Sequence, residues 1–225
     1  MILMKPKAVL ESLTLNAESH IEKSGRTCYQ SLPKGQSGYF IRMLVKNGHT
    51  SVLEHAYATF RWYCNRGVTH ELVRHRAGIG YSQESTRFCN YKGGVMFMVP
   101  GEIEIPDMFC GMEVRAYDGH LQQHSDAGGQ VHKIGEVAFD WATHMEACEE
   151  YYQGCIEAGN KPGFARGGLP IDVKTEIVVT ANFRAWRTVL GQRTSMKAHS
   201  HIRFLADTTL KKLAYLAPSC FEDLL

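Results

Sequence analysis

The chain has 225 residues, of which 44% are apolar and 21% charged, and these values suit one large globular domain or two small ones sharing a core. The formal net charge of +2 excludes the strong overall positive field of many nucleic-acid-binding proteins, so any basic site is local. We expect no signal peptide and no membrane span, because no long apolar run occurs. Seven cysteines without a Cys-x-x-Cys pair favour a reduced, cytoplasmic protein, and the scattered histidines predict no metal site.

Short strands and helices alternate in the first half of the chain, as judged from hydrophobic periodicity and turn-forming residues. In chain order we expect a strand over 7–15, a helix from its cap Asn16 to Gly25, a loop over 28–38, a helix over 39–46, a strand over 57–63, a turn over 65–67 and a short helix over 71–75 capped by Thr69. The last of these helices delivers the chain into a basic stretch, residues 74–87.

The second half contains the longest predicted helix. In chain order we expect a strand over 95–99, an insertion or embellishment over about 102–129, a helix over 131–155, a loop over 159–170, a strand over 171–179, a helix from its cap Asn182 to Gly191 and a final helix over 195–215. Apolar residues recur every three or four positions along 131–155, which predicts an apolar stripe roughly 37 Å long. Such a stripe suits a core helix of one subunit and a contact between subunits equally well.

The basic stretch is the most informative segment for function. Arg74, His75 and Arg76 follow one another, and Ser85 and Arg87 come after a loop that contains two glycines. Guanidinium groups match phosphate oxygens with paired hydrogen bonds, and serine hydroxyls add further donors. Any one of these arginines alone suits a weak surface ion pair. Together they predict a site for a polyanionic ligand.

These residues carry a resemblance to a known family. Arg74-His75-Arg76, a spacer of eight residues and Ser85-Thr86-Arg87 together resemble the hallmark of the flavin-dependent thymidylate synthases. The flanking segments resemble the same family in order: His49-x-Ser51-x-x-Glu54-His55, Thr69-His70-Glu71, Ala165-Arg166, Leu169-Pro170, Asn182-x-Arg184-x-Trp186-Arg187 and Arg193. The similarity extends from about residue 28 to residue 203 apart from 102–129.

The resemblance implies a fold and a reaction. Members are α/β (α+β) proteins with a central, mostly antiparallel sheet flanked by long helices, so residues 1–225 are expected to form a single domain that assembles as a homotetramer with active sites shared between subunits. The implied reaction is the reductive methylation of dUMP to dTMP. It uses non-covalent FAD, NADPH as reductant, and methylenetetrahydrofolate as the one-carbon donor, and it needs no cysteine nucleophile. Small molecules, and no nucleic acid, are the implied ligands.

The resemblance also implies roles for individual residues. Arg193 is the implied catalytic residue, because it would face the uracil carbonyl and stabilise the charge that develops there. The residues implied to bind dUMP are Glu71, Arg74, Gln83, Ser85, Arg87, Arg166 and Arg193. The residues implied to bind FAD are His49, Ser51, Arg74, His75, Arg76, Gln83, Asn182, Arg184 and Thr188, with Asn182 and Arg184 given from another subunit.

The sequence departs from the family pattern in a few places. The spacer between Arg76 and Ser85 has eight residues where seven is usual, and the extra residue falls within 77–80. Thr188, Lys197 and His201 also replace residues that are usual in the family. Two alternatives therefore stay open beside the synthase: a member that binds flavin or nucleotide without turnover, and a nucleic-acid-binding module that uses the same arginines.

Overall fold

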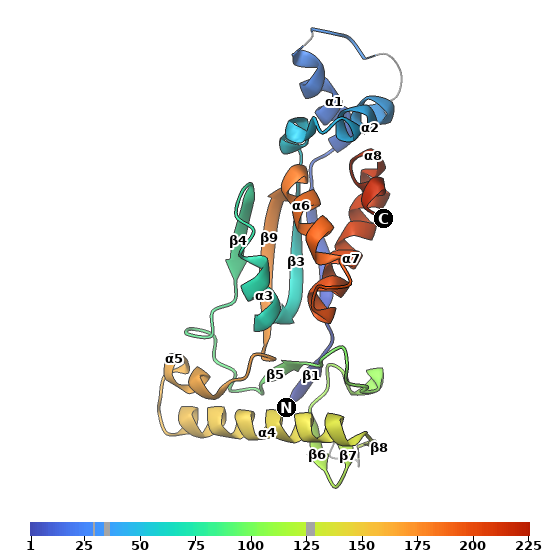
Figure 1. Ribbon diagram of the computed structural model, residues 1–225. Coiled ribbons are helices and arrows are strands. Elements are labelled where there is room, and N and C mark those ends of the chain that lie inside the picture. Colours follow the sequence, from blue (N-terminus) through green and yellow to red (C-terminus); the bar gives the residue numbers. More distant parts are fainter. Residues whose placement is uncertain (29, 34–36, 125–128) are drawn as a thin grey trace. The chain divides into compact units, whose positions relative to one another are not determined.

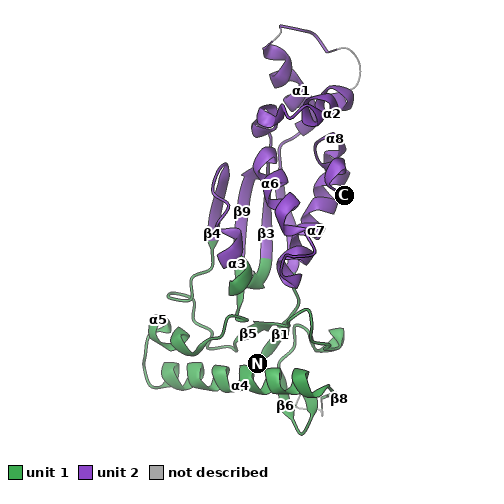
Figure 2. Ribbon diagram, viewed as in Figure 1, with its two compact units in different colours: residues 1–6, 63–69, 83–176 green, residues 7–62, 70–82, 177–225 purple. Residues whose placement is uncertain are grey.

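The protein is described by a computed structural model that covers residues 1–28, 30–33, 37–124 and 129–225 (Figure 1). The chain forms two compact units (Figure 2). Unit 1 contains residues 1–6, 63–69 and 83–176, and unit 2 contains residues 7–62, 70–82 and 177–225. Each unit is therefore built from three separate segments of the chain. A single domain over 1–225 stays a prediction.

Unit 1 contains two small sheets and the longest helix. Strand β1 (Ile2–Met4) pairs in parallel with β5 (Met96–Met98). Strands β6 (Val114–Tyr117), β7 (His120–Gln123) and β8 (Val131–Lys133) form an antiparallel sheet. The helices of this unit are η2 (Asp107–Phe109), α4 (Glu136–Glu157), α5 (Pro162–Ala165) and η3 (Arg166–Gly168). Part of the segment interpreted as an insertion thus has regular structure, and its positions 125–128 lie outside the described residues.

The core of unit 1 forms where α4 packs on β6 and on the residues around β1 and β5. Met145 and Tyr152 lie on the buried face of α4, and they contact a cluster that includes Leu3 and Phe97. The predicted apolar stripe therefore packs inside its own unit from Ile134 onward, as the first of the two alternatives expects, whereas its first member, Val131, is exposed in β8. Val137, outside the stripe, is 74% exposed.

Unit 2 is built on the four-stranded sheet, whose order is β2–β3–β9–β4. The strands are β2 (Lys7–Leu13), β3 (Tyr57–Asn65), β9 (Lys174–Asn182) and β4 (Ile79–Gln83), and the last three have residues in both units. Phe183 N donates to Ala56 O at 2.8 Å, and the hydroxyls of Thr59 and Thr180 lie 2.9 Å apart. The residue numbers of the paired positions increase along β3 while they decrease along β9, so the two strands are antiparallel.

The other two strand pairs follow the same rule. Thr14 N donates to Tyr57 O at 2.9 Å beside the Arg61–Glu11 ion pair, so β2 and β3 are antiparallel. Asn182 N donates to Gly78 O at 3.1 Å in unit 2, and Glu84 N donates to Glu176 O at 2.9 Å in unit 1. These contacts make β4 and β9 antiparallel as well. The prediction of a mixed α+β fold with a mostly antiparallel central sheet is confirmed.

Two helices of unit 2, α6 (Phe183–Arg193) and α7 (Ser200–Leu216), lie beside this sheet (Figure 1). The other helices of the unit are α1 (Ala17–Thr27), α2 (Ser37–Lys46), η1 (Thr50–His55), α8 (Pro218–Phe221) and η4 (Glu222–Leu224), while α3 (Arg66–Leu72) begins in unit 1. Two buried tryptophans fix α6 and α7 to the sheet. Trp186 Nε1 donates to Ala58 O at 3.0 Å, and Trp62 Nε1 donates to Thr209 Oγ1 at 3.1 Å. Each indole thus satisfies its one polar group while it fills the core.

Some predicted boundaries in the first half are wrong. The short helix is α3, which begins at Arg66 and ends at Leu72, because Asn65 Oδ1 accepts from Val68 N at 3.0 Å and caps it. Thr69 is therefore not a cap, and 65–67 is not a separate turn. Asn16 precedes α1 in a left-handed conformation without a side-chain cap, and the helix continues past Gly25. The predicted loop over 28–38 ends at the start of α2, and its positions 29 and 34–36 lie outside the described residues.

In the second half, α4 begins at Glu136 and not at 131, because residues 131–133 pair with β7. The predicted loop over 159–170 contains the short helices α5 and η3, and β9 begins at Lys174 and not at 171. Helix α6 continues past Gly191 to Arg193, and α7 begins at Ser200 and not at 195. The predicted cap of α6 is confirmed, since Asn182 Oδ1 accepts from Ala185 N at 2.8 Å.

All seven cysteines are free thiols. Cys64 and Cys220 are buried, and burial raises the pKa of each to about 12. Cys28 is exposed, and the other four are half-buried. Among the described residues, no helix has both the length and the apolarity that a membrane span requires.

Candidate active site

Arg193 ends α6 and is the centre of a polar cluster in unit 2. Its Nη1 donates to Glu71 Oε2 at 2.7 Å, its Nη2 to Glu71 O at 3.1 Å and its Nε to His75 Nε2 at 3.1 Å. The Arg193 side chain is 21% exposed and that of Glu71 37%. A guanidinium has five N–H donors, so three are engaged and two remain for a ligand. The protein thus holds Arg193 in one orientation.

His75 is held as a neutral imidazole in this cluster. Burial lowers its pKa, and the adjacent Arg193 guanidinium lowers the pKa further. Because His75 Nε2 accepts from Arg193, the ring proton belongs on Nδ1. Tyr81 holds the backbone on which His75 sits, since the one proton of its hydroxyl is shared between Leu72 O at 2.9 Å and His75 O at 2.7 Å. Burial raises the pKa of Tyr81 to about 12, so the hydroxyl stays a donor.

Gly78 places the basic stretch against the start of α6. Its φ of +73° is in the left-handed region, and a Cβ at this position would lie 2.5 Å from Asn182 Nδ2. Asn182 N donates to Gly78 O, while Asn182 Oδ1 caps α6. Asn182, a predicted site residue, is buried, and it links the loop at Gly78 to the start of α6. Only glycine meets both the conformational and the steric demand at 78.

The remaining unit 2 residues implied to bind FAD lie on exposed surface. Arg74 and Arg76 are exposed, and no described acidic residue pairs with either of them. His49 and Ser51 are exposed at the start of η1. Arg184 pairs with Glu54 at 2.6 Å, and Thr188 Oγ1 donates to Arg184 O at 3.3 Å. Of the two other departures from the family pattern, Lys197 is exposed and His201 is buried.

Unit 1 contains the other four predicted residues. Ser85 opens a tight turn, in which its carbonyl oxygen accepts from Phe88 N at 3.0 Å and Cys89 N at 2.9 Å. Arg87 is exposed on this turn, and Arg166 Nη1 donates to Thr86 Oγ1 at 3.1 Å. Ser85, Arg87 and Arg166 are thus brought together. The two guanidinium groups make no ion pair with the part of unit 1 that the structure describes.

Gln83 is held before this turn, because its Nε2 donates to Thr69 Oγ1 at 3.1 Å and to Thr175 Oγ1 at 3.3 Å. The neighbouring Glu84, Tyr91 and Lys174 form a half-buried hydrogen-bonded group that sequence reasoning missed. The alternation of apolar residues over 171–179 predicts Lys174 on the polar face of the strand, so no sequence signal indicated that it is buried with these partners. No cluster of three or more metal-ligating side chains occurs among the described residues, and the absence of a metal site stays an expectation.

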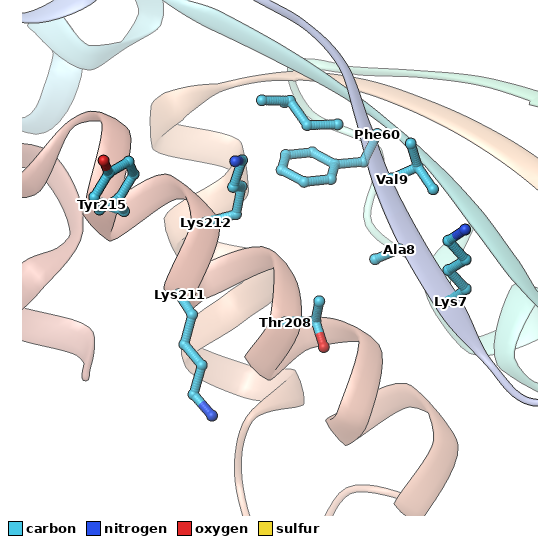
Figure 3. A pocket seen from close by; sticks show the side chains of 9 residues that line it. Lys7, Ala8, Val9, Phe60, Thr208, Lys211, Lys212 and Tyr215 are labelled. Atoms are coloured by element: carbon cyan, nitrogen blue, oxygen red, sulfur yellow. The ribbon is translucent and has the colours of Figure 1, made fainter. Parts of the chain in front are cut away.

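A cavity of about 740 Å³ in unit 2 lies elsewhere (Figure 3). Phe60 and Val9 contribute apolar side chains from the sheet, and Lys211, Lys212 and Tyr215 line the α7 side. None of the predicted site residues lines it. The predicted site residues therefore form two groups, each within its own unit: one around Arg193 in unit 2 and one around Ser85 in unit 1.

A family model described as thymidylate synthase complementing protein matches residues 9–219. The chain belongs to this family. The membership confirms the resemblance to flavin-dependent thymidylate synthases and makes the chain a member of an enzyme family whose reaction is a methyl transfer. A protein named flavin-dependent thymidylate synthase from Corynebacterium efficiens is 33% identical over 217 residues, which cover 92% of this chain and 79% of the relative.

Other relatives agree. A flavin-dependent thymidylate synthase of Mycobacterium tuberculosis is 34% identical over 209 residues, 90% of this chain and 78% of that protein. The solved structure of a UMP/dUMP methylase, PolB from Streptomyces cacaoi, bound with 5-Br dUMP matches with a TM-score of 0.75 and 22% identity, covering 99% of this chain and 96% of that one. At 22% identity this match supports the fold of the chain and no more.

Proposed function

We propose that this protein methylates dUMP reductively to dTMP, with methylenetetrahydrofolate as carbon donor, FAD as cofactor and NADPH as reductant. Family membership supports the reaction, and one geometric observation carries it. The Arg193 guanidinium is held on three sides by Glu71 and His75, while two of its N–H groups remain free. Donors fixed in advance stabilise charge that develops on a substrate oxygen without reorganising during the reaction.

Arg193 is the proposed catalytic residue. Methyl transfer to C5 of uracil places negative charge on the ring carbonyls, and the two free N–H groups of Arg193 are suited to receive that charge. Glu71 sets the orientation of the guanidinium through its carboxylate and its carbonyl. Neutral His75 adds a third anchor without competing for the substrate as a second cation. We assign the remaining contacts with the uracil ring of dUMP to Arg74 and Gln83.

The dUMP phosphate is proposed to bind Ser85, Arg87 and Arg166 in unit 1. A dianionic phosphate prefers charged donors in fixed positions. Two guanidinium groups and a serine hydroxyl come from one turn and from the start of η3, and Thr86 orients Arg166. Because neither arginine is neutralised by a described carboxylate, the full charge of both is available to the ligand.

The residues also suit a flavin. FAD contains a diphosphate, and Arg74 and Arg76 supply two exposed guanidinium groups without described acidic partners on one short loop. His75, His49, Ser51, Asn182, Arg184, Thr188 and Gln83 complete the proposed set. A bound flavin would supply the hydride that completes the methyl group. The homotetramer with shared sites and the cytoplasmic location belong to the same proposal.

The test is direct. The purified protein should be yellow, should release FAD on denaturation, and should form dTMP from dUMP only when methylenetetrahydrofolate and NADPH are present. Replacing Arg74 with alanine should reduce the ratio of bound flavin to protein, because a charged hydrogen-bond partner is lost. Protein that is colourless and forms no dTMP after reconstitution with FAD would reject the synthase. Flavin binding without turnover would instead support the inactive alternative.

A further inference from the structure

Glu84 is fixed from three directions in unit 1. Its backbone N–H donates to Glu176 O at 2.9 Å. Its Oε1 accepts from the Tyr91 hydroxyl at 2.5 Å, and its Oε2 accepts from Lys174 Nζ at 3.0 Å. The Glu84 side chain is 15% exposed and that of Lys174 11%. Both carboxylate oxygens of a largely buried group are therefore satisfied, which is the condition under which a buried charge is tolerated.

Tyr91 is held against α4 by a ring contact and two hydrogen bonds. Its ring packs against the buried Tyr152 ring with centroids 5.7 Å apart. Tyr91 N donates to the Tyr152 hydroxyl at 3.2 Å, and Tyr91 O accepts from Gln153 Nε2 at 2.8 Å. Burial raises the pKa of Tyr91, and the hydrogen bond to Glu84 raises the pKa further, so the hydroxyl remains a donor.

Glu84 and Tyr91 stand on either side of the turn over residues 85–90, and their side chains meet. The turn carries Ser85 and Arg87, which are proposed to bind the phosphate. One side is anchored to β9 through Lys174 and the other to α4 through Tyr152. Ordering a backbone costs conformational entropy, so a turn that is ordered before the ligand arrives binds more tightly than one ordered by the ligand.

We propose that Glu84 and Tyr91 are positioning residues, whose side-chain hydrogen bond holds the turn over 85–90 in its phosphate-binding conformation. This inference rests on the proposed function of Ser85 and Arg87. Neither side chain touches the phosphate. Each acts through the turn, and Lys174 fixes Glu84 so that its carboxylate stays directed at Tyr91.

The experiment uses the chain of 225 residues and three variants: Tyr91→Phe, Glu84→Ala and the double variant. Tyr91→Phe removes one hydroxyl and keeps the ring contact with Tyr152. The matched control is Tyr117→Phe in β6, which makes the same chemical change in unit 1 at a side chain that is 73% exposed. Calorimetric titration with dUMP and with deoxyuridine separates the contribution of the phosphate from that of the rest of the nucleotide. Amide exchange without ligand reports on the turn itself.

In Tyr91→Phe we expect the Kd for dUMP to rise about tenfold, which corresponds to about 1.4 kcal/mol, while the Kd for deoxyuridine and kcat at saturation stay near those of the wild type. The amides of Phe88 and Cys89, which donate to Ser85 O, should exchange faster. The double variant should be no worse than Glu84→Ala, because both changes break the same bond. If the two substitutions instead damaged the structure independently, their effects on the Kd for dUMP would add.

Unchanged exchange and unchanged dUMP binding in Tyr91→Phe would overturn the proposal, as would additive effects in the double variant. If Glu84→Ala does not fold, Tyr91→Phe alone decides through the same two measurements. Failure of the proposed function is distinguishable. Wild-type protein that binds dUMP no more tightly than deoxyuridine would remove the phosphate role of the turn, and the exchange rates would still test the bond between Glu84 and Tyr91.

Discussion

Replacing Arg193 with alanine tests the central chemical argument. The change removes two N–H groups that are free for a ligand and three that bind Glu71 and His75. Loss of a fixed donor to a developing oxyanion costs about 10²–10³ in kcat. We expect a fall of at least about 10²-fold in kcat, equivalent to about 2.7 kcal/mol of transition-state stabilisation. KM for dUMP should change less, because the interaction strengthens as charge develops.

Stability should change much less than activity. The Arg193–Glu71 pair is partly exposed, with side chains 21% and 37% accessible, and such pairs contribute about 0–1 kcal/mol. For a chain of this size, 1 kcal/mol corresponds to about 2–4 °C in Tm. A drop of many degrees would therefore indicate that Arg193 is a structural residue.

Steady-state kinetics of dTMP formation, after the flavin content has been matched, measures the effect. The matched control is Arg42→Ala, which breaks the exposed ion pair with Glu222 in the same unit. Arg42 belongs to no predicted site, so its variant should keep the wild-type kcat. If Arg193→Ala also keeps full kcat, Arg193 is a helix-end cation with a weak ion pair and the proposed chemistry is wrong.

Three further predictions follow from the same contacts. Arg87→Ala should raise KM for dUMP more than it lowers kcat, because the phosphate is bound alike in ground and transition states, and equal effects on both constants would contradict the role. The pKa of His75 is lowered in the folded protein, first by burial and then by Arg193, so the unfolded chain binds the proton more readily. The free energy of unfolding should therefore decline as pH falls through the ordinary imidazole pKa of 6.5. Urea denaturation at several pH values should show a smaller decline for His75→Asn than for the wild type, and an equal decline in the two proteins would refute the role of His75. Gly78→Ala and Gly48→Ala both place a side chain at positive φ, +73° and +75°, but only the first meets Asn182. Gly48→Ala should cost about 1–2 kcal/mol in urea denaturation and Gly78→Ala about 1–3 kcal/mol more, so equal costs would show that the contact yields freely.

Sequence patterns predicted the elements that have strong local signals. The cap at Asn182 and the strand from Tyr57 were found, because a capping side chain and a run of β-favouring residues act locally. The hairpin β6–β7 was missed although Asp118-Gly119, with φ of 48° and +74°, is a typical two-residue turn. The start of the helix predicted over 131–155 was placed too early, because the apolar residues at the start of this range suit a strand as well as a helix. In the structure residues 131–133 pair with β7 and form a strand.

The candidate site was partly predictable as well. The resemblance to the family implied roles for Arg193, Glu71 and His75, but it gave no indication that Glu71 and His75 bind Arg193, since the contacts join positions 118 and 122 residues apart. The group of Glu84, Tyr91 and Lys174 was missed for the same reason, because its members lie on different elements. Contacts of this kind depend on tertiary packing, which periodicity and spacing do not encode.

The distribution of thiols has a practical consequence for spectroscopy. Cys28 is exposed, whereas Cys64 and Cys220 are buried and their raised pKa of about 12 keeps them as unreactive thiols. A maleimide dye added in limiting amount should therefore attach to Cys28 ahead of the other positions. This places a fluorescent reporter at the end of α1, on the native sequence and away from Arg193 in the chain. Ligand titrations could then be followed optically without an engineered cysteine.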